Sequence, residues 1–307
     1  MGADGKDGPA IDQCPTAPFI WPLTNTGPPR TGKRMPELPE VETVRAGLER
    51  LLGADAAIAH VELLRADLRA PIPPQIIPRL RLAKILSVRR RAKYLLFDTS
   101  GGILLSHLGM TGTWRLAPTG EERLHDHCYL YLRDGRRLAF RDPRRFGLLD
   151  LIEPGSESTH PRLAELGPEP LNTATFTVEY LRACCRGRRQ AIKPVIMDQQ
   201  VVVGVGNIYA QEALFRAGIR PTRAAGQLTK NAVATLIQHI RTVLQEAIAA
   251  GGSTISDFRQ AGGDGGYFQH NFQVYDRIGQ PCHVCGTTLS GAVIGGRGTT
   301  WCRLCQA

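Results

Sequence analysis

The sequence predicts an α+β protein with an N-terminal β-sandwich, a helical second half and a small C-terminal hairpin segment. Short apolar runs separated by turn residues fill the first half, which is typical of antiparallel strands. Beyond the break at residues 167–170, apolar residues recur with helical periodicity. Four cysteines then gather near the C-terminus. We therefore expect domains at 35–165, 166–275 and 276–307, preceded by an extension at 1–34.

The N-terminal domain opens with an amphipathic helix. From Leu38, the segment LPEVETVRAGLERLL is predicted to be helical, and Gly53 ends it. Its apolar residues fall on one face, namely Val41, Val44, Leu48, Leu51 and Leu52.

Strands follow this helix. The runs KILSV, KYLLFDT and GGILLSHLGM are short, apolar and separated by turns. In YLYLRDGRRLAFRD, Asp134 and Gly135 lie between two strand-like arms, which predicts a β-hairpin. These patterns indicate one helix with an antiparallel sandwich.

The second half is helical. TVEYLRACC predicts one helix, and NIYAQEALFRAG predicts another that starts at Asn207 and ends before Gly218. The longest helix is predicted in TKNAVATLIQHIRTVLQEAIAAGG, ending at Gly251 and Gly252. Its apolar stripe consists of Val233, Leu236, Ile237, Ile240, Val243, Leu244 and Ile248.

The first 34 residues differ from the rest. They are rich in Gly, Pro and Thr, show no periodicity and contain no apolar core of a secretory signal. We expect this extension to be disordered, or to result from a start codon assigned too far upstream.

The bulk composition favours a polyanionic partner. The net charge of +10 and the pI of about 9.5 suggest nucleic acid, the alternative being scattered surface charge. No apolar run approaches the ~18 to 20 residues of a membrane span. We expect a monomer without membrane contact.

The cysteine pattern predicts a structural zinc site. Cys282-x2-Cys285 and Cys302-x2-Cys305 form two chelating pairs around a segment of hairpin length. Two disulfides or free thiols are the alternative. The other four cysteines, Cys14, Cys128, Cys184 and Cys185, make no disulfide framework, which indicates a reducing cytoplasm. Arg297, just before Cys302, should be exposed.

Six motifs occur in an order that resembles one family. They are MPELPEVETV at 35–44, HLGMTG at 107–112, DPRRFG at 142–147, LGPEPL at 166–171, VVGVGNIYAQEALFRAGIRP at 202–221 and the terminal cysteines. Together they resemble bacterial formamidopyrimidine-DNA glycosylase, a glycosylase and AP lyase of base excision repair that removes 8-oxoguanine. The resemblance covers 35–307. It implies a β-sandwich, a helix-two-turn-helix domain and a zinc finger, with double-stranded DNA between the two domains.

The resemblance implies a catalytic set. Pro36, exposed as the N-terminus once the methionine is removed, matches the amine that attacks the deoxyribose. Glu37 matches the acid–base carboxylate and Glu40 a second carboxylate of the site. Lys93 matches the lysine assigned to β-elimination, and Arg297 the arginine assigned to δ-elimination.

These residues also have structural interpretations. Pro36 would suit the first turn of a helix, and the two carboxylates would stabilise a helix dipole. The neighbours of Lys93 (Arg89, Arg90 and Arg91) would form a solvated basic strand end.

Further residues match DNA contacts of the family. Met110, Arg144 and Phe146 match the side chains that fill the space of the extruded base. Contacts with the DNA backbone are implied for His125, Arg189, Lys193 and Asn207. For Asn207 there is a direct reason, because the turn at 204–206 would bare helix N-terminal amides for a phosphate.

Two matches concern the lesion itself. Glu212 is expected near the lesion pocket, with a buried, paired structural role as the alternative. The glycine-rich residues 262–266, with Tyr267 and Phe268, match the loop that caps the extruded base.

Two other functions remain open from the sequence. Endonuclease VIII enzymes share the architecture but prefer oxidised pyrimidines; Leu38, HLGM and DPRRFG favour the purine branch. A DNA-binding protein without catalysis is the second alternative, because residues 1–35, if retained, would make the Pro36 nitrogen an amide. A start at Met35 is our preferred interpretation, and cleavage before Pro36 the other.

Overall fold

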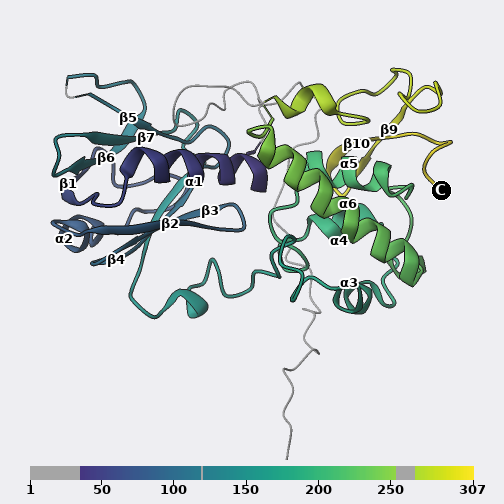
Figure 1. Ribbon diagram of the computed structural model, residues 1–307, viewed down its shortest axis with the longest axis horizontal. Helices are drawn as coiled ribbons and strands as arrows, with labels where there is room; N and C mark the ends of the chain where they lie inside the picture. Colours follow the sequence, from purple (N-terminus) through teal and green to yellow (C-terminus); the bar gives the residue numbers. More distant parts are fainter. Residues whose placement is uncertain (1–34, 119, 254–266) are drawn as a thin grey trace, which may run out of the picture.

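The structure is a computed structural model that describes residues 35–118, 120–253 and 267–307. The predicted disorder of residues 1–34 and the predicted capping loop at 262–266 fall outside these residues. A β-sandwich and a helical half lie side by side along the long axis (Figure 1). The predicted α+β class is confirmed.

Helix α1 (Leu38–Leu52) begins and ends where the sequence predicts. Gly53 follows it with φ 70°, a backbone conformation that favours glycine. Of the predicted apolar face, Leu51 is only half-buried, whereas the other four residues are buried. The N-terminal end of α1 points at the helical half, where α1 packs on α6 (Lys230–Ala249) (Figure 1).

Two four-stranded antiparallel sheets form the sandwich. One has the order β1-β6-β7-β5 and the other β2-β3-β4-β8. The strands are β1 (Ile58–Leu63), β2 (Ile85–Arg91), β3 (Tyr94–Thr99), β4 (Gly102–His107), β5 (Thr113–Leu116), β6 (Asp126–Leu132), β7 (Arg137–Arg141) and β8 (Leu148–Ile152). The short helix α2 (Ile76–Leu80) precedes β2.

The sandwich core joins residues from both sheets. The Trp114 ring lies 5.2 Å from that of Phe97 and 5.1 Å from that of Phe140. The predicted hairpin at Asp134 and Gly135 is confirmed, since it connects β6 to β7. Gly135 has φ 87°, as such turns require.

The helical half contains α3 (Val178–Cys185), α4 (Ile192–Met197), α5 (Asn207–Arg216) and α6. Within the described residues, the connections contain the short 3-10 helices η1 (Glu157–Thr159), η2 (Ala225–Gln227) and η3 (Phe268–Asn271). The predicted stripe of α6 is buried except for the half-buried Ile248. No helix in the described part of the chain is long and apolar enough to span a membrane.

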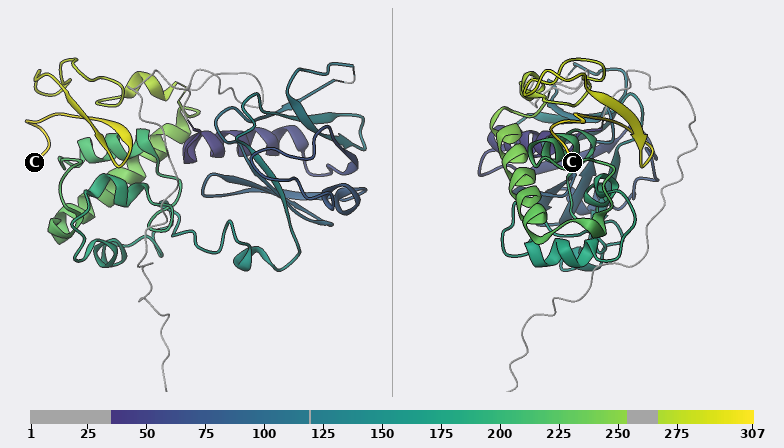
Figure 2. Two further views of the ribbon diagram at one scale, coloured as in Figure 1. Left: turned by 180° about the vertical axis from the view of Figure 1, so that it is seen from behind. Right: turned by 90° about the vertical axis from the view of Figure 1, so that its right-hand side faces the viewer.

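A two-stranded hairpin completes the chain. Strands β9 (Ser290–Ile294) and β10 (Arg297–Trp301) pair antiparallel between the two cysteine pairs, as predicted. Both views of Figure 2 show this yellow hairpin on the helical half. It packs against α5 through β10.

We predict that Leu48→Ala lowers the free energy of unfolding by about 3 kcal/mol, because it leaves a cavity in the core. Leu48 is fully buried in α1. Urea unfolding followed by tryptophan fluorescence measures the change. Leu51→Ala, in the same helix but half-buried, is the matched control and should cost clearly less. Equal losses at both positions would contradict this packing of α1.

Candidate active site between the two halves

The N-termini of α1 and α5 meet at the junction of the two halves. The buried carboxylate of Glu37 accepts backbone N–H groups from Gly206 and Ile208, both at 2.9 Å, and from Tyr209 at 3.4 Å. The Leu38 amide donates to the carbonyl of Gly204 at 3.1 Å. A carboxylate at a helix N-terminus is favourable because it faces the positive end of the helix dipole.

This contact corrects one prediction. The amides at the start of α5 were expected to be free for a phosphate beside Asn207. Instead, those of residues 206, 208 and 209 are already bound to Glu37. The sequence could not show this, because the partners are 171 positions apart.

Glu37 changes its protonation near neutral pH. Burial raises the pKa of its carboxyl group to about 7, the charge of Glu40 adds to this, and Lys93 and two backbone amides oppose it. Since a carboxyl of this pKa is partly protonated at neutral pH, it can give or take a proton during a reaction.

Glu40 ties three segments together. Its fully buried carboxylate accepts the Glu37 amide at 2.9 Å, the Tyr209 hydroxyl at 2.6 Å, and both the amide and hydroxyl of Ser253 at 2.9 Å. Burial, together with this carboxylate, raises the pKa of Tyr209 well above its usual range. Glu40 can therefore stabilise the dipole of α1, as predicted, and also connect α1 to Tyr209 and Ser253 of the helical half.

Lys93 lies in the tight turn between β2 and β3. The preceding residue, Ala92, has φ 54°, and its amide donates to Glu169 at 2.7 Å. Glu169 also accepts Arg90 at 2.8 Å and Arg91 at 3.2 Å. Glu169 belongs to the LGPEPL motif, but no role was predicted for it from the sequence.

The basic residues before Lys93 are held in ion pairs, and only Arg89 among them is exposed. Arg90 is paired with Glu42 and Glu169 and its side chain is only 11% exposed. Arg89 is paired with Asp98 and Glu157.

Electrostatic interactions place Lys93 with the other candidate catalytic residues. Burial lowers the pKa of the Lys93 amine, Glu37 and Glu40 oppose that shift, and Arg297 adds to it. The charges of Glu37, Glu40 and Arg297, which come from separate parts of the chain, thus all act on the Lys93 amine.

The charges of Glu37 and Arg297 also act on the amine of Lys193. It is fully buried, and its Nζ donates to Asn207 Oδ1 at 2.6 Å and Thr299 Oγ1 at 2.7 Å. Burial lowers the pKa of this amine to about 7. Direct contact of Lys193 with the DNA backbone, predicted from the sequence, does not fit this burial. Lys193 instead positions Asn207, whose Nδ2 donates to the carbonyl of Gly298 at 3.2 Å.

Glu212 has the structural role that was the alternative to the lesion pocket. It is fully buried in α5, and its carboxylate accepts the amides of Gln273, Val274 and Tyr275 at 2.9 to 3.0 Å. Burial raises the pKa of Glu212. It fastens the segment that leads to the cysteine hairpin.

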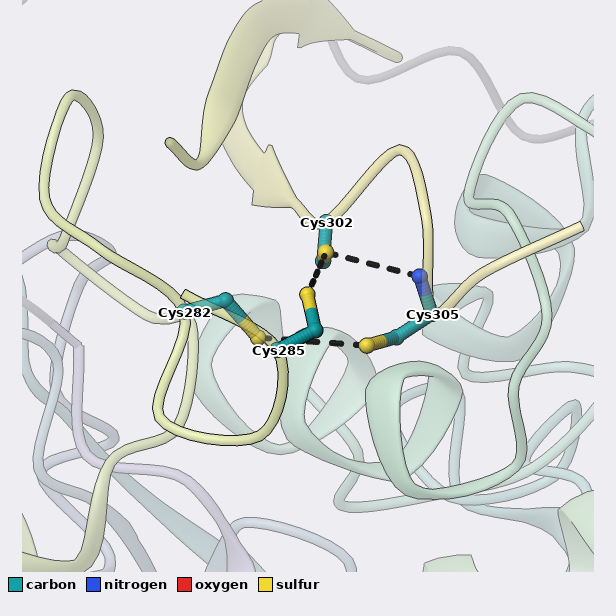
Figure 3. Close-up of side chains that lie close together, drawn as sticks. All are labelled: Cys282, Cys285, Cys302 and Cys305. Carbon is teal, nitrogen blue, oxygen red and sulfur yellow. Dashed lines mark hydrogen bonds between the residues drawn. The ribbon is translucent and has the colours of Figure 1, made fainter. Parts of the chain in front are cut away.

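The four predicted metal ligands converge (Figure 3). Their sulfur atoms all lie within 4.8 Å of one another. The pairs Cys282–Cys305 and Cys285–Cys302 are 3.9 Å and 3.4 Å apart, and none of the four forms a disulfide. A tetrahedron of sulfurs at the ~2.3 Å Zn–S distance has edges of about 3.8 Å. The site therefore fits one structural zinc ion.

Two loops bring Met110, Arg144 and Phe146 together. The Thr111 hydroxyl and the Gly147 amide both donate to the buried carboxylate of Asp142. At Gly109, with φ 63°, a Cβ would lie 2.3 Å from the backbone of Phe146, so only glycine fits.

The exposed end of this pair of loops carries two of the predicted inserting side chains. The guanidinium of Arg144 lies 4.7 Å from the ring centre of Phe146, and that ring is 42% exposed. Met110, in the neighbouring loop, is half-buried. The two loops that carry the three residues are joined through the carboxylate of Asp142.

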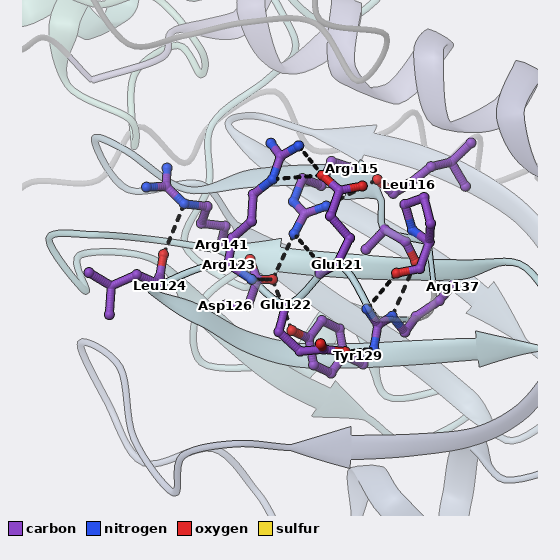
Figure 4. A network of polar contacts seen from close by, with 12 residues as sticks. Arg115, Leu116, Glu121, Glu122, Arg123, Leu124, Asp126, Tyr129, Arg137 and Arg141 are labelled. Atoms are coloured by element: carbon purple, nitrogen blue, oxygen red, sulfur yellow. Dashed lines mark hydrogen bonds and ion pairs between the residues drawn. The ribbon is translucent and has the colours of Figure 1, made fainter.

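His125 lies at the same edge. Its φ is 74°, and its carbonyl accepts the Asp142 amide at 3.0 Å. A polar network holds the loop that carries it (Figure 4). There, Asp126 accepts Arg115 at 2.7 Å and the Tyr129 hydroxyl at 2.9 Å. No role was predicted for His107 from the sequence, but its Nδ1 accepts the Gly109 amide at 2.9 Å and so supports the loop of Met110. Burial lowers the pKa of His107 to about 3.

Arg189 lies apart in the chain, exposed between α3 and α4. Its predicted contact with the DNA backbone stays a prediction.

Three consecutive parts of the sequence match known domain families. Residues 35–149 match the formamidopyrimidine-DNA glycosylase N-terminal domain, and residues 166–259 match the H2TH domain of the same enzymes. Residues 279–307 match the zinc finger found in FPG and IleRS.

Individual proteins agree with these matches. A formamidopyrimidine-DNA glycosylase of Bdellovibrio bacteriovorus is 53% identical over 272 residues, covering 89% of this chain and all of that protein. The MutM (FPG) structure from Thermus thermophilus is 42% identical, with a TM-score of 0.79 over 88% of this chain and 98% of that one. The Lactococcus lactis FPG complex with DNA containing FAPY-dG is 34% identical, with a TM-score of 0.80 over 88% and 99%.

We predict that Cys302→Ser abolishes metal binding, because a structural zinc needs all four ligands. Since bound metal stabilises such a small segment, the chain beyond residue 276 should become sensitive to protease while the sandwich stays intact. Metal analysis and limited proteolysis measure both effects. Cys128→Ala, at a buried cysteine outside the cluster, should keep one zinc per chain. Full zinc content in Cys302→Ser would contradict the site.

Proposed function

Since this chain belongs to the formamidopyrimidine-DNA glycosylase family, we propose that it excises 8-oxoguanine and formamidopyrimidines from duplex DNA through the amine of Pro36. It is a DNA glycosylase and AP lyase of base excision repair with one structural zinc. The observation that carries the catalytic assignment is the Glu37 carboxyl group, directly after Pro36, with a pKa of about 7.

The chemistry follows from an amine nucleophile. The lone pair of Pro36 forms a bond to C1′ of the lesion nucleotide, and the base leaves with the electron pair of the glycosidic bond and takes up a proton. Opening of the sugar ring and loss of one proton give an iminium ion. Loss of a C2′ proton then expels the 3′ phosphate, and loss of a C4′ proton expels the 5′ phosphate. Water releases the sugar fragment and restores the amine.

Each catalytic residue has a proposed part. Protonated Glu37 gives its proton to the ring oxygen as the sugar opens. Lys93, with its lowered pKa, serves as the base of the first elimination and binds the adjacent phosphate. Arg297, exposed on the hairpin, binds the phosphate expelled in the second elimination.

The remaining residues bind and distort the duplex. Met110 and Phe146 fill the space of the extruded nucleotide, and Arg144 hydrogen-bonds the orphaned partner base. His125 and Arg189 bind phosphates of the backbone, with the positive net charge of the chain adding attraction. We expect the enzyme to work on chromosomal DNA in the bacterial nucleoid.

One alternative follows from the residues that precede Pro36 in the sequence. If residues 1–35 stay attached, the Pro36 nitrogen is a tertiary amide without an available lone pair, and the chain would bind damaged DNA without cleaving it. The family match begins at residue 35, which supports a working chain with a free Pro36 amine.

An endonuclease VIII-like preference would show as faster excision of thymine glycol than of 8-oxoguanine.

We predict that borohydride traps a covalent adduct with lesion DNA when the chain starts at Met35, because methionine removal frees the Pro36 amine. The chain expressed from Met1 and left uncleaved should give no adduct. Gel electrophoresis of the trapped complex, with N-terminal sequencing of both preparations, measures this. Equal trapping by an intact Met1 chain would rule out Pro36 as the nucleophile.

We predict a bell-shaped pH profile for base excision. Excision needs the Pro36 amine without its proton, with a pKa near ~8 for an α-amino group, and Glu37 with its proton, at a pKa of about 7. Because the pKa of the amine lies above that of the acid, the rate should rise up to about pH 7, stay level to about pH 8 and fall above that. Glu37→Gln should lower the rate by about 10²- to 10⁴-fold and remove the alkaline limb.

Single-turnover excision from an 8-oxoguanine duplex measures both effects. Glu42→Gln is the matched control, because Glu42 lies in the same helix but is paired with Arg45 and Arg90. Its profile should be that of the unchanged enzyme. If the rate of Glu37→Gln still falls at high pH, a group other than Glu37 causes that fall.

A further inference from the structure

We propose that Gln211 is a positioning residue for Arg297, because it fastens the free edge of β10 to the helical half. This inference rests on the proposed part of Arg297 in the second elimination. It concerns a residue that does not reach the DNA or the reacting atoms.

The side chain of Gln211 takes the place of a neighbouring strand. It is buried in α5, and its Oε1 accepts the Thr300 amide at 2.6 Å while its Nε2 donates to the Gly298 carbonyl at 3.2 Å. The opposite edge of β10 pairs with β9. A carboxamide offers the same acceptor and donor as a peptide group, so it pairs with the Thr300 amide and joins Asn207 Nδ2 at the Gly298 carbonyl.

The same side chain is fixed at its own end. Its Nε2 also donates to the Asn207 carbonyl at 2.8 Å, one turn earlier in α5. Gln211 therefore holds β10 at a set distance from the first turn of α5. That is the turn whose amides bind the carboxylate of Glu37.

Arg297 lies directly beside the fastened residues. Its carbonyl accepts the hydroxyl of Thr299 at 2.9 Å, and that hydroxyl in turn accepts Lys193 at 2.7 Å. The Arg297 side chain itself is exposed. Its reach toward the site is thus set by how the backbone of β10 is held, since a two-stranded hairpin alone is only marginally stable.

The two eliminations should respond differently to loosening of β10. Base release and the first elimination use Pro36, Glu37 and Lys93, which belong to other segments. The second elimination removes the C4′ proton and breaks the C5′–O5′ bond, and its leaving phosphate is the proposed ligand of Arg297. Small displacements of a catalytic group, of the order of 1 Å, cost about 100-fold in rate.

The test is Gln211→Met in the chain that starts at Met35, because methionine keeps the length of the side chain and removes its amide. A duplex with one 8-oxoguanine gives singly and doubly eliminated products that a sequencing gel separates. We expect the rate constant of the second elimination to fall about tenfold or more. Base excision, borohydride trapping and zinc content should be unchanged.

Gln306→Met is the matched control. Gln306 is a second buried glutamine that docks the finger, donating to the Ile219 carbonyl and accepting the Cys302 amide, both at 2.9 Å. Neither of these two partners belongs to β10. An equal loss of the second elimination in Gln306→Met would mean that any loosening of the finger has this effect, and would overturn the proposal.

Two further variants complete the test. If Gln211→Met does not fold, Gln211→Glu keeps an acceptor for Thr300 but lacks the donor for Gly298, and the same shift is expected. Arg297→Ala separates the two hypotheses. If it slows the second elimination and the Gln211 variants do not, the positioning role is wrong. If Arg297→Ala leaves the products unchanged, the proposed part of Arg297 fails first and this inference with it.

Discussion

The carboxylate of Glu37 connects the beginning of the sandwich to the beginning of helix α5, and the site depends on that connection. Backbone amides 169 to 172 positions away donate to it. Hydrogen bonds to a charged group are worth about 1.5 to 3 kcal/mol each, which favours the ionised form. Burial acts in the opposite direction and prevails, because the pKa rises to about 7. One group thus joins two halves of the molecule and stays able to carry a proton.

Acidic side chains that bind backbone amides recur around the site. Glu169 holds the turn of Lys93, Glu212 holds the segment that leads to the finger, and Asp142 holds the loop of Phe146. Loops have amides without a partner from regular secondary structure, and a carboxylate accepts several at once. A chain with a net charge of +10 therefore uses buried negative charge to shape a surface suited to a polyanion.

The finger contributes through how it is docked as well as through its metal. The four thiolates fix the ends of the hairpin. Polar side chains of α4 and α5, namely Lys193, Asn207 and Gln211, reach its nearer strand. Metal and docking thus act on different parts of the same element. The charge of Arg297, on this hairpin, contributes to the lowered pKa of Lys93.

The sequence by itself determined the main helices, several strands, the zinc ligands and the family. Periodicity, turn residues and cysteine spacing are local signals, so α1, α6 and the two hairpins lie where they were predicted. The tertiary structure alone decided how polar groups are partnered. In the folded chain, the amides beside Asn207 bind Glu37, and Lys193 is buried. Glu212 binds backbone amides, and Arg90 is paired with Glu169. Such partners come from distant segments, and the free energy of burying a charge depends on which of them the fold brings within hydrogen-bond distance.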